Sequence, residues 1–144
     1  MLGDASAPPS RLAFSIVDLV PVQPSGIASP PAHYAHGVLV KDVRRLFFSS
    51  GVVPIRPDGT VPDEIAIQAE VVWSNLSAIL DEAGLGMTDV LSVTTYVVSG
   101  QDLASVMAAR DRALGGHLAA STLVVVAELA QSAWKVEIAL VAAC

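Results

Sequence analysis

Residues 62–84, PDEIAIQAEVVWSNLSAILDEAG, decide the fold of this chain. Their apolar side chains recur at alternating steps of four and three residues, the spacing of one buried face on an α-helix. Thr60 or Asp63 is placed to cap the start, and Gly84 can take the left-handed conformation that ends a helix. The stripe that this helix would bury consists of Ile65, Ala69, Val72, Leu76, Ile79 and Ala83.

The rest of the chain predicts strands on both sides of this helix, and one more helix. The expected strands are short apolar runs rich in β-branched residues. The first two are separated only by a short turn at Asp42, so they are expected to form a hairpin. Asp102 is placed to cap a second helix that runs to about Leu114 before Gly115-Gly116. The strands are expected at 37–41, 45–50, 91–98, 121–128 and 135–142.

The order ββαβαββ predicts an α+β fold, in which a mixed sheet carries both helices on one face. The last two strands are apolar at consecutive positions, as in LVVVA at 123–127, which indicates strands buried on both faces. The helices can cover only one face. The chain is 53% hydrophobic with a mean hydropathy of +0.59, so we expect another subunit to cover the second face.

A Pro-rich arm precedes the predicted domain. Residues 1–32 hold six of the nine prolines, and proline removes hydrogen-bond donors from the main chain. Within the arm, residues 12–22 are candidates for an edge strand. We therefore divide the chain into an extended arm at 1–32 and one α+β domain at 33–144, which suits a length of 144 residues.

Charge and composition exclude several classes of function. Eight basic and fourteen acidic residues give a net charge of −6 without a basic stripe, which argues against a nucleic-acid partner. There is no uncharged apolar run of about 18 residues, so a membrane span is not expected. Cys144 is the only cysteine, which fits a reducing, cytoplasmic setting. No phosphate loop, dinucleotide fingerprint or metal-ligand spacing occurs, and His33 with His36 alone is a weak metal signal, so no cofactor or metal is expected.

Several short motifs follow one another along residues 32–142: Tyr34, FSSGVVP at 48–54, VTTYV at 93–97, AST at 120–122 and VEI at 136–138. In order and spacing they resemble the Rid family of small imine/enamine deaminases, also called YjgF or L-PSP endoribonuclease-like proteins. The resemblance implies a chorismate-mutase-like subunit, a homotrimer, and a pocket for a small molecule at each subunit interface.

The resemblance also marks where this chain departs from the family pattern. The deaminating members carry an arginine, which grips the substrate carboxylate, where this chain has Ala120. The family's usual asparagine is replaced by Met107 and a glutamine by His36. Losing a bidentate, charge-assisted contact costs about 2–4 kcal/mol in binding a carboxylate, or roughly 30- to 1000-fold in affinity. The retained positions are Tyr34, Ser50, Gly51, Thr122 and Glu137.

Imine hydrolysis requires an activated water and a proton donor to nitrogen. Glu137 is the candidate for orienting the water, and Tyr34 for lining the pocket and donating through its hydroxyl. Ser50-Gly51 can offer main-chain N–H groups, and Thr122 or His36 can contact a ligand. Each of these residues also has an ordinary structural role open to it. Two hypotheses result: an imine or enamine hydrolase whose substrate lacks the usual carboxylate anchor, or a non-catalytic trimer that binds a small metabolite.

Overall fold

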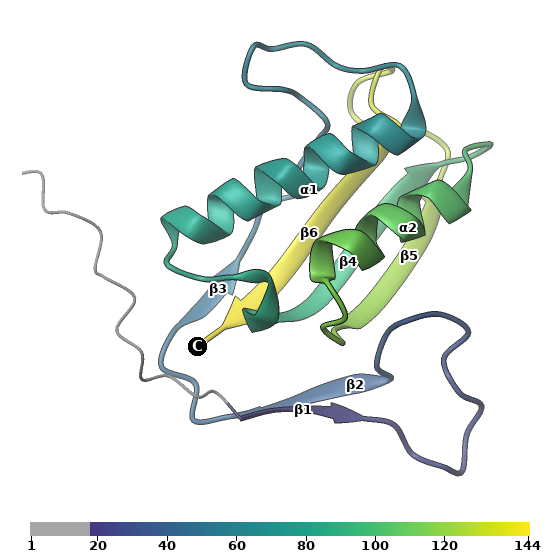
Figure 1. Cartoon of the computed structure of the whole chain (residues 1–144). Coiled ribbons are helices and arrows are strands. Elements are labelled where there is room, and N and C mark those ends of the chain that lie inside the picture. The colour runs from purple at the N-terminus through teal and green to yellow at the C-terminus, as the bar shows by residue number, and fades with distance from the viewer. Residues whose placement is uncertain (1–17) are drawn as a thin grey trace, which may run out of the picture.

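The computed structural model describes residues 18–144, so the predicted strand at 12–22 lies partly outside the described residues. The structure has the elements β1 (Asp18–Val22), β2 (Gly37–Lys41), β3 (Leu46–Phe48), α1 (Ile65–Glu82), a 3-10 turn η1 (Met87–Asp89), β4 (Val90–Val98), α2 (Leu103–Leu114), β5 (Ala120–Val126) and β6 (Val136–Ala143). Figure 1 shows α1 and α2 side by side across one face of the main sheet.

The main sheet has four strands in the order β3-β6-β4-β5. β4 and β5 are parallel, whereas β6 is antiparallel to both of its neighbours, so the sheet is mixed. On the face toward the helices, β4 and β6 contribute side chains that are almost completely buried, and these pack against Val72, Leu76 and Leu80 of α1. The predicted α+β class and the placement of two helices on one face are confirmed.

Helix α1 is shorter than predicted. It begins at Ile65, after a Glu64 that makes no capping hydrogen bond, and neither Thr60 nor Asp63 caps it. Thr60 is engaged elsewhere, because its main-chain N–H and its hydroxyl both donate to Asp58 Oδ1. The helix ends at Glu82, and Gly84, just beyond the cap residue Ala83, takes the expected left-handed conformation with a φ of +72°. The buried stripe also turns slightly: Leu80 is buried, whereas Ile79 is 37% exposed.

Helix α2 begins and ends as predicted. The Asp102 carboxylate accepts a hydrogen bond from Ala104 N–H at 3.1 Å and another from the Ser105 hydroxyl at 2.6 Å. At the other end Gly115 is in the left-handed region, with its N–H donating to Asp111 O. Local capping chemistry thus fixes both boundaries of this helix.

The predicted hairpin over residues 37–50 is wrong. β2 pairs with β1, in a two-stranded ribbon apart from the main sheet, and β3 pairs with β6. The cause lies in the link at 42–45. The N–H groups of Arg44 and Arg45 both donate to Cys144 O, which ties the chain to the end of β6, and Asp42 has a φ of +55°. The ribbon therefore turns away from β3 and lies along the end of the sheet where β4 begins (Figure 1).

The second face of the main sheet is not covered by any element of the described chain. Leu46 and Phe48 of β3 project from it and are 55% and 66% exposed. β1 pairs with β2 across the boundary predicted at residue 32, so this strand of the arm is joined to the domain. None of the helices in residues 18–144 is long and apolar enough to cross a membrane.

Candidate functional site

Glu137 projects from the face of the sheet opposite the helices. Its neighbours Val136 and Ile138 point toward the helices and are 0% and 1% exposed, whereas Glu137 itself is partly exposed. A Cβ atom placed on Gly51 would lie only 2.8 Å from Cδ of Glu137 and closer still to Oε1. The carboxylate therefore fills the space that any side chain at position 51 would need.

Ser50 and Gly51 form a β-bulge beside this carboxylate. Ser49 N–H donates to Leu140 O at 2.9 Å, and Val52 N–H donates to Ile138 O at 2.8 Å. Between these two bonds the chain advances three residues, from 49 to 52, whereas β6 advances only two, from 138 to 140, which leaves one extra residue in the bulge. The Ser49 hydroxyl accepts from Leu140 N–H and donates to Ser50 O, which holds the bulge. The N–H groups of Ser50 and Gly51 have no acceptor among residues 18–144. The carboxylate and two free donors thus lie together.

Tyr96 adds an aromatic ring to this group. It stands directly opposite Glu137 in the pairing of β4 with β6, and directly opposite residues in a sheet point to the same face. The sequence did not mark Tyr96 as a candidate, because only the pairing register reveals its neighbour. We call Ser50, Gly51, Tyr96 and Glu137 the carboxylate half-site.

Main-chain pairing brings the segment that carries a second group of the predicted residues to the start of β5. Ala35 N–H donates to Ala119 O at 3.1 Å, and Ala35 pairs with Ala120 in a parallel bridge. This pairing holds the segment 34–36 against β5. Ala120 and Thr122 project from the same uncovered face as Glu137, as the pairing with β4 requires. We call Tyr34, His36, Ala120 and Thr122 the strand half-site.

The two half-sites are far apart within one chain. Glu137 and Val124 flank Tyr96 on either side, so two strand spacings separate them, and Ala120 lies four residues farther along β5. With strands about 4.8 Å apart and about 3.3 Å per residue, Glu137 and Ala120 are roughly 16 Å apart. A small ligand on Glu137 cannot reach the strand half-site of the same chain.

An apolar groove begins next to the carboxylate half-site. Its volume is about 390 Å³, and it runs from Gly51 along the following loop to the outer side of α1. The amide of Asn75 fixes the loop by donating to Ile55 O at 2.9 Å. The lining residues are Gly51, Val52, Val53, Ile55, Asn75, Ala78 and Ile79.

Comparison with known proteins identifies the family. Residues 26–144 match the family model described as endoribonuclease L-PSP. The chain belongs to this family, the Rid or YjgF family.

Two curated relatives and one solved structure show how close this Rid chain is to others. It is 34% identical over 113 residues to the 2-iminobutanoate/2-iminopropanoate deaminase of Escherichia coli, covering 76% of this chain and 85% of that protein. It is 35% identical over 83 residues to a RutC family protein of Haemophilus influenzae, covering 57% of this chain and 64% of that protein. The structure of the Rid protein YyfB from Yersinia pestis, whose function is unknown, matches with a TM-score of 0.81 at 25% identity, over 89% of this chain and 100% of that one.

A basic residue from elsewhere in this Rid chain could in principle replace the family arginine at Ala120, but Arg56, Arg110 and Lys135 do not. Arg110 is buried on the helix side of β5, where it donates to Ser121 Oγ at 3.1 Å and to Asp111 Oδ1 at 2.9 Å. Arg56 contacts Thr60 Oγ1, and Lys135 Nζ donates to Asp63 O. None of these three positive charges therefore lies at Ala120 on the uncovered face.

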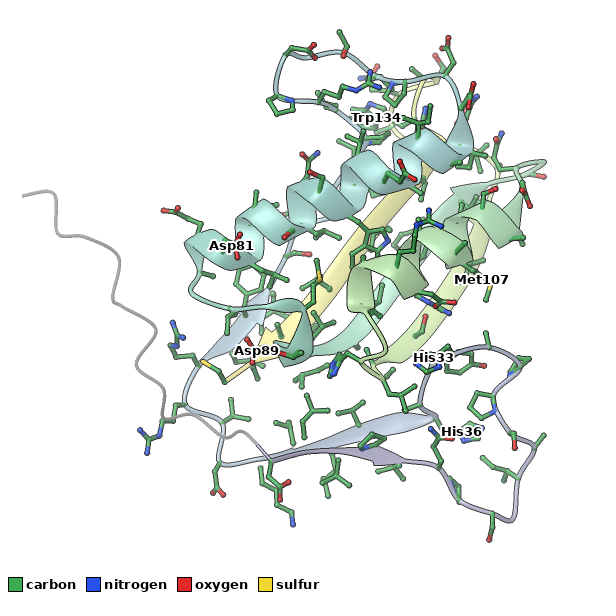
Figure 2. All side chains as sticks on the ribbon, in the orientation of Figure 1. His33, His36, Asp81, Asp89, Met107 and Trp134 are labelled. Carbon is green, nitrogen blue, oxygen red and sulfur yellow. The ribbon has the colours of Figure 1, made fainter. Side chains whose placement is uncertain are left out.

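The remaining candidates lie apart from the carboxylate half-site. Met107 is on α2, which covers the opposite face of the sheet (Figure 2). His33 and His36 lie close together on the segment leading into β2, and His33 Nε2–H donates to Gly116 O at 3.3 Å. Among residues 18–144 no three His, Cys, Asp or Glu side chains gather as a metal site would require.

Proposed function

We propose that this Rid protein hydrolyses a reactive imine, or its enamine tautomer, to a carbonyl compound and ammonia. The proposal rests on the Glu137 carboxylate, which packs against Gly51 beside two unpaired main-chain N–H groups. It is supported by membership of a family in which a relative of 34% identity is an imine deaminase. The class of enzyme is therefore a hydrolase that acts on a carbon–nitrogen double bond.

In the proposed reaction Glu137 holds a water molecule against the imine carbon. The water oxygen forms a bond to carbon as its proton passes to the carboxylate, and the nitrogen receives a proton from a donor such as the Tyr34 hydroxyl. The protonated Glu137 then supplies a proton to nitrogen as the carbon–nitrogen bond breaks and ammonia leaves, while the hydroxyl proton of the intermediate passes to the Tyr34 oxygen as the carbonyl forms, which restores both groups. The free N–H groups of Ser50 and Gly51 hydrogen-bond the substrate or the developing oxygen anion.

The proposed substrate has no carboxylate anchor. Ala120 cannot pair with a carboxylate, and Arg56, Arg110 and Lys135 are engaged elsewhere in the chain. The groove that starts at Gly51 is lined mostly by apolar side chains, which suits an apolar substituent. We therefore expect neutral alkyl imines to be preferred over the 2-iminocarboxylates named for the E. coli relative.

The proposed site lies between subunits of a homotrimer. Support comes from the roughly 16 Å between Glu137 and Ala120, which only a second chain could bridge. It also comes from the exposed apolar side chains of β3 on the uncovered face. Thr122 and His36 are proposed to meet the ligand from a neighbouring subunit, whereas Met107, on the helix side of the sheet, is withdrawn from the proposed site. A cytoplasmic location and the absence of a cofactor remain predictions.

The test is hydrolysis of an alkyl imine generated in situ from isobutylamine by an amine oxidase, followed as ammonia release above the uncatalysed rate. Wild-type protein should accelerate it, and Glu137→Gln should lower kcat by roughly 100-fold or more because the general base is lost. Replacing Ser74, which is exposed on α1, by alanine is the control and should leave kcat unchanged.

Two outcomes would overturn the proposal. One is faster turnover of 2-iminopropanoate than of the alkyl imine, which would show that the protein has a carboxylate anchor. The other is no turnover of either, with tight binding of a neutral ligand that Glu137→Gln changes by only about one hydrogen bond, roughly 1 kcal/mol. That second result would favour the non-catalytic binding protein.

A further inference from the structure

The β1–β2 ribbon leaves an unpaired strand edge, and so does β3. Within residues 18–144, β2 pairs only with β1, and β3 pairs only with β6. Free edges of apolar strands tend to pair with another chain, and soluble proteins usually protect them. Neither strand is protected by a proline or a bulge inside it, so both edges are open to a partner strand.

Exposed apolar side chains are concentrated on the part of the chain that carries these strands. Seven of the twelve large hydrophobic residues that are exposed in the described chain fall between residues 20 and 48. Leu39 of β2 is 50% exposed and Phe48 of β3 is 66% exposed. Placing Leu39 opposite Phe48 joins these side chains on one face, whereas a shift by two residues would set Gly37 or Lys41 against Phe48.

We propose that β2 of a second copy of this chain pairs with β3, and that this pairing assembles the site. This inference rests on the proposed function. In the register with Leu39 opposite Phe48, Gly37 faces Ser50, so residues 34–36 of the second copy run beside Gly51 and Glu137. Since Ala35 is bonded to Ala119 and Ala120, the strand half-site of the second copy arrives with its β2. The carboxylate half-site and the strand half-site then face one another.

Pairing between copies keeps contacts that folding back within one chain would break. For β2 to reach β3 of its own chain, the segment 34–36 would have to leave β5. The bond from Ala35 N–H to Ala119 O would be lost, together with the burial of Ala35, which is only 2% exposed. Pairing of β2 with β3 of another copy retains this hydrogen bond and the burial of Ala35, and it adds a new strand pairing.

The symmetry of this contact agrees with a closed ring. Each copy contributes its β2 to one neighbour and binds the β2 of another neighbour at its own β3. The two surfaces in contact therefore differ, which makes the interface heterologous. A heterologous contact has to close into a ring or grow into a filament. A closed ring satisfies every β2 and β3, and a trimer is the ring that the family resemblance implies.

Engineered disulfides distinguish the possible pairings. Directly opposite residues in antiparallel strands have Cα atoms about 4.5–5.5 Å apart, within the range of a disulfide. In a Cys144→Ser background, full-length Leu39→Cys and Phe48→Cys chains carrying different tags are co-expressed and oxidised. We expect a covalent dimer that contains both tags. The matched control pairs Leu39→Cys with Leu103→Cys, since Leu103 is also exposed but lies on α2, and it should give no dimer.

The double variant Leu39→Cys/Phe48→Cys supplies the contrary outcome. Covalent oligomers on a non-reducing gel support exchange, whereas a monomer with an internal disulfide shows that β2 folds back on its own β3. No disulfide of either kind, with both thiols reactive toward maleimide, also overturns the inference. The imine assay distinguishes failure of this inference from failure of the proposed function. If the variant with the internal disulfide is active, the proposed function is retained and the strand exchange is rejected. If the cross-linked chains have no turnover, the strand exchange is retained and the proposed function is rejected.

Discussion

A glycine decides where the Glu137 carboxylate can lie. The position that a Cβ on residue 51 would occupy is taken by the end of the Glu137 side chain, which is flexible and partly exposed. The resemblance marked Ser50, Gly51 and Glu137 in the sequence as retained positions. Their contact was not visible, because it depends on the bulge that shifts 49–52 by one residue against β6.

Replacing Gly51 by alanine should therefore displace the carboxylate rather than unfold the protein. We expect kcat for the alkyl imine to fall by about tenfold or more, since a general base must stay within hydrogen-bond reach of its water. The melting temperature should change little, because the Glu137 side chain can rotate into solvent. The control is Gly26→Ala, where an added Cβ meets nothing within 4 Å. A variant that keeps full kcat would show that the contact between residues 51 and 137 has no part in catalysis.

At the scale of elements, the sequence predicted best where local chemistry settles the outcome. The boundaries of α2 follow from Asp102 and Gly115, and the strands β4 and β6 follow from their apolar runs. It failed at the link 42–45, which has the length of a hairpin turn but is held by the carbonyl of Cys144, about a hundred residues away in the sequence. It also missed Tyr96, because the register of β4 against β6 is set by the assembled sheet.

The Asp102 cap should make the stability of α2 depend on pH. The hydrogen bond from the Ser105 hydroxyl, followed by that from Ala104 N–H, lowers the pKa of Asp102 below its ordinary value of 3.8. A carboxyl whose pKa is lower in the folded state stabilises the fold above its unfolded pKa and loses that effect as the pH falls. The difference in melting temperature between wild type and Asp102→Ala should thus be full at pH 7 and shrink below about pH 4. Asp102→Asn, which can still cap but carries no charge, should lie between wild type and Asp102→Ala at pH 7, and its advantage over Asp102→Ala should not change as the pH falls. A difference that is constant from pH 7 to pH 2.5 would contradict this account.

At the scale of the whole molecule, composition and structure point to the same surface. The chain is 53% hydrophobic, and seven of the twelve large apolar side chains left exposed in the described chain lie between residues 20 and 48, the segment that holds the β1–β2 ribbon and β3. A net charge of −6 without a basic stripe gives no support to nucleic acid as a substrate, although the family's description names an endoribonuclease. A small neutral substrate and a copy of the same chain are the partners that we propose for this surface.

A charge at position 48 should test the assembly and the site together. By light scattering at micromolar concentration we expect wild-type protein to have three times the 14.9 kDa mass of one chain. Phe48→Lys should dissociate it, because each interface loses about 1.5–3 kcal/mol of apolar burial and gains an unpaired charge. Imine turnover should fall with the mass, since Glu137 is then separated from the strand half-site of the neighbouring chain. Leu103→Lys places the same charge on α2 and should preserve both mass and turnover, which distinguishes a lost interface from a general effect of lysine. A wild-type monomer, or a Phe48→Lys trimer with normal turnover, would show that β3 takes no part in the assembly.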